Sequence, residues 1–285
     1  MLHNIPITVL MTTYNCGQFI KTSINSILNQ NYKNFELLII DDGSDDNTGD
    51  VIKEVNSDKI RYIWLEHIGR SAALNYGLKV ASFEWVALMD ADDLAAPERL
   101  EKEISLINGN NQNIIFSDSV YFMNNKIQFL NMVNPEKEDM KRKIELRGHI
   151  CNSSVVYNRN FILENGGYNE KLVHSEDHEL WIRLLNKGNF IHVNDWLIFM
   201  RIRKNSLSTK VNDSPPRKIS IFDGSNNPMI EKKIGILRIG REYMFRKKVK
   251  LRVKYFLWKY WNYKAYISLS EKLSDLSKSG AVFSQ

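Results

Sequence analysis

The sequence predicts an α/β protein with a Rossmann-like, doubly wound and mostly parallel sheet, followed by a C-terminal helical appendage. In the first hundred residues, short apolar runs alternate with stretches of helical periodicity. Two of these runs end in clusters of aspartate. From residue 249 onward, apolar residues recur at helical spacing within a strongly basic segment. The first two observations predict the sheet and its ligand-binding edge, and the third predicts the appendage.

Strands and helices alternate along the first hundred residues. The predicted strands are residues 7–11, 35–40, 60–65 and 86–89, with helical patterns at residues 20–28 and 72–80. This order predicts right-handed crossovers, so the strands run parallel and end at one rim. Beyond them, a strand is expected within residues 148–157. Residues 119–147 are interpreted as a variable acceptor-facing insertion, and the proline- and glycine-containing residues 212–228 as a linker.

Composition restricts the class of protein. A chain of 285 residues with 43% hydrophobic and 25% charged residues can form one sizeable globular core plus an appendage. Its two cysteines, Cys16 and Cys151, lie far apart in the sequence, which argues against a disulfide framework. The N-terminus lacks signal-peptide features and no apolar run is long enough to span a bilayer. We therefore expect a cytoplasmic location.

Asp90, Asp92 and Asp93 directly follow the apolar run at residues 86–89. Carboxylates at the end of such a strand lie in the crevice where open α/β sheets bind ligands. The D-x-D spacing suits Mg²⁺ or Mn²⁺ with positions left open for phosphate oxygens. For an isolated D-x-D, the alternative is a solvated acidic turn before a helix that starts near Pro97.

A second acidic strand end, Asp41 and Asp42, favours a ligand site. One strand-end aspartate can accept a hydrogen bond from a base or a ribose hydroxyl, while the other pair holds a cation against a pyrophosphate. Together they predict a nucleoside diphosphate lying across the sheet edge. The first strand is not followed by G-x-G-x-x-G, and G-x-x-x-x-G-K-[ST] is absent, so dinucleotide-binding and P-loop proteins are disfavoured.

An ordered set of motifs resembles family 2 glycosyltransferases of the inverting, metal-dependent type with the GT-A fold, as found in bacterial surface polysaccharide or lipooligosaccharide synthesis. The motifs are residues 9–15, 41–46, 69–77, 90–93, 166–168, 176–183 and 201–208. The resemblance implies a GT-A catalytic domain at 1–210, with a nucleotide-sugar half at 1–95 and an acceptor half at 96–210. A linker or cleft-side loop at 211–230 and a basic, aromatic helical region at 231–285 would follow.

For the donor, the resemblance implies that Thr12, Thr13 and Tyr14 cradle the nucleobase and that Asp42 accepts the uracil N–H. Arg70 matches an arginine that reaches the base or the phosphates in some relatives. Two structural alternatives remain: Tyr14 could pack the first helix onto the sheet, and Arg70 could be a solvated residue at a helix start. Asp41 could be purely structural.

The resemblance places Asp90 at the ribose and Asp92 on a divalent metal, Mn²⁺ or Mg²⁺, with Asp93 supporting Asp92. The metal would neutralise the departing diphosphate. Residues 199–208 resemble the family ending Y-R-x-H-x-x-S-x-S, with arginine at the histidine position. Because arginine has no lone pair for a cation, Arg201 and Arg203 are expected to bind phosphate instead.

An inverting transfer also needs a base that takes the acceptor proton. The resemblance makes Asp177 that base and Glu176 a neighbour that binds the acceptor or shapes the pocket. Ser175 or a neighbour is expected to cap the helix that follows, whose first turn favours ionised carboxylates. Alternatively, both acids only complement the helix dipole. His174 and His178 are interpreted as bystanders.

The C-terminal residues 231–285 carry 14 Lys and Arg against 4 Asp and Glu, whereas residues 1–230 carry 25 against 29. Val249, Val253, Phe256, Tyr260, Tyr263 and Ile267 form a helical stripe among lysines at positions 247–259. Such a helix could lie peripherally on the anionic inner face of the cytoplasmic membrane, or pack its stripe on the catalytic domain. No nucleic acid partner is expected, since nothing else supports one.

The expected function is non-processive, inverting transfer of a hexose or N-acetylhexosamine from a UDP-sugar to a glycan or lipid-linked glycan hydroxyl, forming a β-linkage. The Q-x-x-R-W motif and membrane spans of processive relatives are absent. One alternative is a nucleotidyltransferase that makes a sugar nucleotide, although residues 12–17 lack its glycine-rich basic loop. The other is a non-catalytic module that binds a sugar nucleotide or a membrane.

Overall fold

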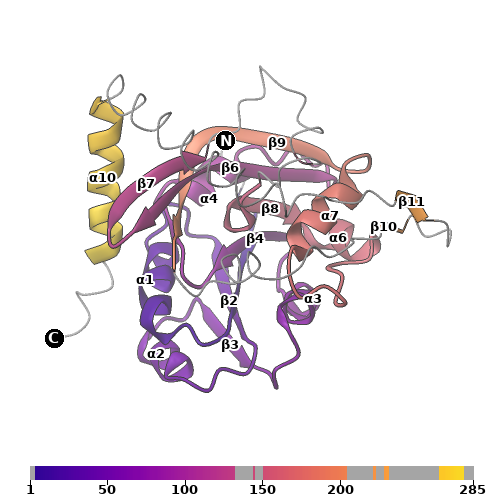
Figure 1. The fold of residues 1–285 in the computed structure, drawn as a ribbon, viewed down its shortest axis with the longest axis horizontal. Helices are drawn as coiled ribbons and strands as arrows, with labels where there is room; N and C mark the ends of the chain where they lie inside the picture. Colours follow the sequence, from indigo (N-terminus) through magenta and orange to yellow (C-terminus); the bar gives the residue numbers. More distant parts are fainter. Residues whose placement is uncertain are drawn as a thin grey trace.

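A computed structural model describes residues 4–131, 144, 150–203, 221–222, 228–230 and 263–278. Within them a sheet with strand order β3-β2-β1-β4-β8-β6-β9-β5, and with β7 paired to β6, forms the centre of the molecule (Figure 1). A separate small hairpin pairs β10 (Ile221–Phe222) with β11 (Pro228–Ile230). Helices pack on the central sheet, which confirms the predicted α/β class.

The first half of the sheet is parallel, as the sequence predicts. Its strands are β1 (Ile7–Thr13), β2 (Phe35–Asp41), β3 (Ile60–Trp64) and β4 (Trp85–Asp90). β1 lies between β2 and β4 and pairs in parallel with both. Nearly every residue of β1, β2 and β4 is buried. Burial on both faces explains why these strands read as continuous apolar runs in the sequence.

Three helices connect these strands: α1 (Gly17–Leu28), α2 (Thr48–Glu54) and α3 (Arg70–Val80). In Figure 1, α1 and α2 lie to the left of β2 and β4, and α3 lies to the right. A Cβ at Gly77 of α3 would be 2.4 Å from Leu10 Cδ1. The absence of a side chain at Gly77 therefore lets α3 approach the sheet closely.

The second half of the sheet mixes directions. β8 (Val155–Asn158) is antiparallel to both β4 and β6 (Asn113–Met123). β9 (Asn189–Arg201) runs parallel to β6, and the short β5 (Leu94–Ala95) is antiparallel to β9. The predicted strand within residues 148–157 corresponds to β8, preceded by the 3₁₀ turn η1 (Asn152–Ser154). The purely parallel arrangement is thus confined to the first four strands.

Residues 119–131 are part of the sheet, where the sequence analysis expected a variable acceptor-facing insertion and placed no strand. β6 continues to Met123 and turns into β7 (Lys126–Asn131). Asn124 and Asn125, with φ of 49° and 55°, form the two-residue turn. Positive φ at both central residues is what a tight hairpin turn of this hand requires, and asparagine tolerates it. The Asn-Asn pair was the overlooked signal.

The remaining helices border the sheet. They are α4 (Arg99–Ile104), α6 (Arg159–Glu164), α7 (Glu176–Leu184) and α10 (Tyr263–Lys278). α6 starts at a capped position, because Asn158 Oδ1 accepts hydrogen bonds from the backbone N–H groups of Asn160 and Phe161. α7 follows a loop and brings Glu176 and Asp177 to its first turn.

The C-terminal helix α10 stands beside the β6–β7 hairpin (Figure 1). Its Leu269, Leu273 and Leu276 are buried in one apolar cluster with residues of β6 and β7. Lys272 of α10 forms an ion pair with Glu98. The described helix thus packs through leucines that lie outside the predicted stripe, and the lysine-rich residues 247–259 lie outside the described residues.

Membrane crossing finds no support in the described segments, where every helix is too short or too polar for it.

Both cysteines are free and buried. Cys16 and Cys151 are each 5% exposed and belong to the same apolar cluster as the β1 side chains. Burial raises the pKa of the Cys16 thiol to about 12 and also raises the pKa of the Cys151 thiol. Neither thiol forms a disulfide, as the sequence predicts.

Candidate functional site

The carboxyl ends of β1, β2 and β4 lie side by side at one rim of the sheet, as the sequence predicts. In the sheet register, Thr12 is the partner of Asp90 on β4, and Thr13 is the partner of Asp41 on β2. Both threonines therefore lie between the two acidic strand ends. Their Oγ1 atoms are buried and, within the described part of the chain, have no hydrogen-bond partner. Buried hydroxyls without partners are uncommon in folded proteins and are available to a ligand.

Asp42 holds the loop between β3 and α3. Its carboxylate accepts hydrogen bonds from the backbone N–H groups of Ile68 at 2.8 Å and Gly69 at 3.1 Å, and its Oδ2 lies 3.1 Å from His67 Nδ1. These contacts use most of the carboxylate's accepting capacity. The predicted contact with a uracil N–H therefore stays a prediction, and the structure gives Asp42 a role in fixing this loop.

Asp41 matches its structural alternative. Its two carboxylate oxygens accept hydrogen bonds from the Ser44 backbone N–H at 2.9 Å and the Tyr62 hydroxyl at 2.8 Å. Asp41 is fully buried. The residue thus closes the turn after β2 and is not presented to a ligand.

Tyr14 is 49% exposed, so it does not pack α1 onto the sheet. Its ring stacks on the imidazole of His67, with centroids 4.4 Å apart and an interplanar angle of 28°. His67 in turn contacts the backbone carbonyl of Asp42 at 2.8 Å. The sequence analysis missed His67, because no motif marks a residue two positions before Gly69. The pair presents an aromatic surface beside Thr13 and Asp42.

Arg70 joins the two halves of the site. From the start of α3, its Nη2 donates to Asp90 Oδ1 at 2.6 Å, and its Nε donates to Glu176 Oε1 at 2.7 Å. The side chain is 27% exposed and doubly paired, so it is not a solvated residue at a helix start. One guanidinium thus brings the end of β4 and the first turn of α7 together.

Asp177 follows Glu176 and is the predicted base. Burial and the neighbouring Glu176 carboxylate raise the pKa of Asp177 to about 6, while the Arg70 guanidinium lowers it. Its Oδ1 accepts the His178 backbone N–H at 2.7 Å. His178 Nε2 contacts the Ile144 carbonyl at 2.9 Å, which suits a structural role.

The predicted cap of α7 is only partly correct. Ser175 is the N-cap residue, but its side chain makes no capping hydrogen bond. Its φ of 61° places it in the left-handed region, which costs energy for a residue other than glycine. Such strain next to a pair of acids is typical of functional sites.

Asp92 lies between two arginines from the end of β9. Its Oδ2 is 2.6 Å from Arg203 Nε, and its backbone carbonyl accepts a hydrogen bond from Arg201 Nε at 2.9 Å. Both guanidiniums lie over the Phe19 ring, with centroid distances of 4.9 and 5.3 Å. The structure therefore brings both predicted arginines to the D-x-D segment.

Asp93 is buried. It accepts hydrogen bonds from Ser153 Oγ at 2.6 Å and the Arg201 backbone N–H at 2.9 Å. Burial and the charges of Asp92 and Asp90 raise the pKa of Asp93 well above its ordinary value. Asp93 thus anchors the D-x-D segment to η1 and β9.

The carboxylates of Asp90 and Asp92 can be compared with the ligands that a divalent cation requires. Mg²⁺ in enzymes of phosphorylated substrates takes one or two carboxylates and completes its octahedron with phosphate oxygens and water. Asp90 contacts Arg70 through Oδ1, and Asp92 contacts Arg203 through Oδ2. No cluster of three or more His, Cys, Asp or Glu forms a cage in the described segments. The residues fit a cation shared with a diphosphate and do not fit a closed protein site.

Comparison with known proteins places this geometry in context. Residues 8–166 match the family described as Glycosyl transferase family 2. The chain is 31% identical over 207 residues to the Escherichia coli UDP-Glc:alpha-D-GlcNAc-diphosphoundecaprenol beta-1,3-glucosyltransferase WfgD, covering 72% of this chain and 80% of WfgD.

Two solved structures share the fold. S. aureus TarS 1-349 in complex with UDP-GlcNAc has a TM-score of 0.59 at 22% identity, over 71% of this chain and 60% of that one. The mannosyltransferase PcManGT from Pyrobaculum calidifontis, in complex with GDP-Man and Mn²⁺, has a TM-score of 0.58 at 16% identity, over 99% and 87%. Because both sequence identities are low, these structural similarities establish the fold alone.

Proposed function

Because the chain belongs to glycosyltransferase family 2 and has a GT-A-like fold, we propose that it transfers a sugar from a UDP-sugar to a hydroxyl of a glycan or lipid-linked glycan. The transfer is non-processive, inverts the anomeric centre and forms a β-linkage. The observation that carries the proposal is the Arg70 bridge, which joins the strand-end Asp90 to the Glu176-Asp177 pair. The carboxylate proposed for the donor side, Asp90, and the two proposed for the acceptor side, Glu176 and Asp177, thus lie in one site.

The donor nucleotide is proposed to bind Thr12, Thr13 and Tyr14, with Asp42 fixing the adjacent loop. The buried threonine hydroxyls without partners and the exposed Tyr14 ring support this position. The names of two similar proteins include UDP-Glc and UDP-GlcNAc, which favours a UDP-linked hexose or N-acetylhexosamine. A third was solved with GDP-Man, so the base must be tested directly.

Asp92, with Asp90 beside it, is proposed to hold Mn²⁺ or Mg²⁺. A cation bound there neutralises the charge that develops on the leaving diphosphate. Arg203 already compensates the Asp92 carboxylate, and Arg201 lies next to it. Since neither arginine can coordinate a cation, both are proposed to add positive charge for the diphosphate.

Asp177 is proposed to accept the proton of the acceptor hydroxyl. The new bond between the acceptor oxygen and the anomeric carbon forms as the bond to the diphosphate breaks. A carboxylate whose pKa is about 6 is mostly ionised at neutral pH and is more basic than an ordinary aspartate. Glu176, paired with Arg70, shapes the pocket beside it.

The test of the function is a donor screen with UDP-glucose, UDP-galactose, UDP-GlcNAc, UDP-GalNAc and GDP-mannose. Each donor is incubated with Mn²⁺ or Mg²⁺ and a panel of undecaprenyl-diphosphate saccharides, and nucleotide release is measured. We expect UDP release only when donor and acceptor are both present, with a product whose NMR couplings show a β-linkage. A nucleotidyltransferase would instead release pyrophosphate from UTP and a sugar phosphate. A binding module would bind UDP-sugars without turnover.

Arg70→Gln should move the acidic limb of kcat/KM to higher pH. In the wild type, kcat/KM should fall below a pH of about 6 because the base becomes protonated. Removing Arg70 takes away a charge that lowers the pKa of Asp177 and leaves the Glu176 carboxylate uncompensated. The matched control is Arg61→Gln, because Arg61 donates to the Val80 carbonyl at the surface. If the acidic part of the pH profile of kcat/KM does not move in Arg70→Gln, the assignment of Asp177 as the base is contradicted.

A further inference from the structure

Among the described residues, no strand pairs with one side of β4 where this strand reaches its acids. β8 pairs with β4 only from Trp85 to Ala87, while the β1 side stays paired to Asp90. Because backbone groups alternate in direction along a strand, Leu88 and Asp90 point their N–H and C=O groups toward the side that β8 leaves open. Side chains replace the ladder there: Arg99 Nη2 donates to the Leu88 carbonyl at 2.9 Å, and Ser153 Oγ accepts the Asp90 N–H at 3.1 Å.

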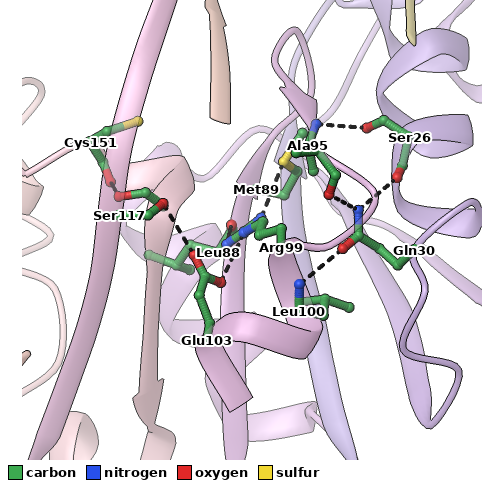
Figure 2. Close-up of polar contacts among 12 residues, drawn as sticks. Ser26, Gln30, Leu88, Met89, Ala95, Arg99, Leu100, Glu103, Ser117 and Cys151 are labelled. Carbon is green, nitrogen blue, oxygen red and sulfur yellow. Dashed lines mark hydrogen bonds and ion pairs between the residues drawn. The ribbon is translucent and has the colours of Figure 1, made fainter. Parts of the chain in front are cut away.

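Arg99 is a costly residue to place at that position. It and Glu103 are both fully buried, and Arg99 Nε donates to Glu103 Oε2 at 3.0 Å. Figure 2 shows the guanidinium between Glu103 on one side and Leu88 and Met89 on the other. A buried ion pair is rarely retained for its stability, because desolvation offsets most of the attraction. Its location at the last peptides before Asp90 therefore suggests a different use.

A buried polar face of α1 holds the other side of the same segment. Ser23 and Ser26 lie three residues apart on one face of α1, Gln30 follows two residues after the helix ends, and all three are fully buried. Ser23 Oγ lies 2.8 Å from the Ala91 carbonyl and 2.7 Å from the Asp93 carbonyl, so one hydroxyl reaches the carbonyl groups of the residues before and after Asp92.

Ser26 and Gln30 continue this attachment toward α4. Ser26 Oγ accepts the Ala95 N–H at 3.1 Å, and Gln30 bonds the Ala96 carbonyl at 2.7 Å and the Leu100 N–H at 3.0 Å (Figure 2). The chain from Leu88 to Leu100 is thus fixed through its backbone by side chains and not only by strand pairing.

We propose that Ser23 and Arg99 are positioning residues for Asp90 and Asp92, a role that rests on the function proposed above. Neither is placed to touch a substrate; each fixes the backbone that carries the two carboxylates. Carboxylates that share a cation with a diphosphate must be held to within a fraction of an ångström. Groups that orient metal-binding side chains typically change affinity or activity by about 10–100-fold when they are lost.

The experiment compares Ser23→Ala with Thr22→Ala. Thr22 precedes Ser23 in α1, and its hydroxyl donates to the Phe19 carbonyl within the helix at 2.7 Å. Calorimetry measures how much Mn²⁺ increases the affinity for UDP, and UDP release measures kcat. Both values are normalised to the concentration of folded protein. We expect Ser23→Ala to lose at least about tenfold in both, and Thr22→Ala to match the wild type. Ser23→Thr, which keeps a hydroxyl, should recover most of the loss.

Hydrogen exchange gives a readout that does not depend on turnover. Ser23→Ala should speed exchange in the peptide covering residues 90–95 and leave the β2 peptide unchanged. Arg99→Lys keeps a positive charge beside Glu103 but cannot contact both Glu103 and the Leu88 carbonyl as the guanidinium does. It should therefore also speed exchange in the peptide covering residues 90–95.

Equal UDP affinity, kcat and exchange in Ser23→Ala and Thr22→Ala would overturn the inference while the proposed function stands. Failure of the wild type to bind UDP with Mn²⁺ or to release it would instead overturn the proposed function.

Discussion

Replacing Asp177 with asparagine should reduce the rate of sugar transfer at least about hundredfold while leaving UDP affinity close to that of the wild type. Asparagine keeps the shape of the side chain but cannot accept the acceptor's proton. The donor site depends on β1, β2 and β4, so UDP binding should persist. Turnover is measured by UDP release at saturating donor and acceptor, and affinity by calorimetry.

The control for Asp177→Asn is the same substitution at Asp195. Asp195 lies on β9, where it pairs with Lys102 at the surface, so the change removes a carboxylate outside the site. Its turnover should equal that of the wild type. If Asp177→Asn keeps more than about a hundredth of the wild-type rate, Asp177 is not the general base.

Asp92→Asn should abolish the gain in UDP affinity that Mn²⁺ produces. A neutral amide is a much weaker ligand for a hard cation than a carboxylate. The substitution also leaves Arg203 without its partner at 2.6 Å. Calorimetric titrations of UDP with and without Mn²⁺ give the two affinities, and their ratio should fall to about one in the variant.

Metal-free UDP binding is the internal control for Asp92→Asn. Thr12, Thr13 and Tyr14 stay unchanged, so the affinity without metal should be retained. An unchanged Mn²⁺-linked ratio in a variant that still binds UDP would refute the role of Asp92.

The parallel half of the sheet could be predicted from sequence because its strands are buried on both faces. Their apolar runs are continuous and need no knowledge of partners. β9 gave no such signal: the register between β6 and β9 shifts around Asp118, and polar residues such as His192 interrupt the apolar pattern. His192 is nonetheless buried against Asp118, 74 residues earlier in the chain. Pairings at that separation are not encoded in local periodicity.

The acidic residues of the site could be predicted from the sequence, but the residues that contact them could not. Asp90 and Arg70 were each recognised, but their ion pair spans 20 residues, and the contact of Arg70 with Glu176 spans 106. Ser23 was passed over because helical patterns are read from apolar residues, whereas this residue is buried through hydrogen bonds to another segment. The individual motifs come from the sequence, and the links between them come from tertiary structure.

The buried cysteines make the native chain a convenient background for fluorescent labelling. Since Cys16 and Cys151 are buried and their raised pKa values leave almost no thiolate at neutral pH, both should resist maleimide dyes. A cysteine introduced at Val173, which is 64% exposed and three residues before Glu176, would then react selectively. Its emission would report on the entrance to α7 as nucleotide is added, without prior removal of the native thiols.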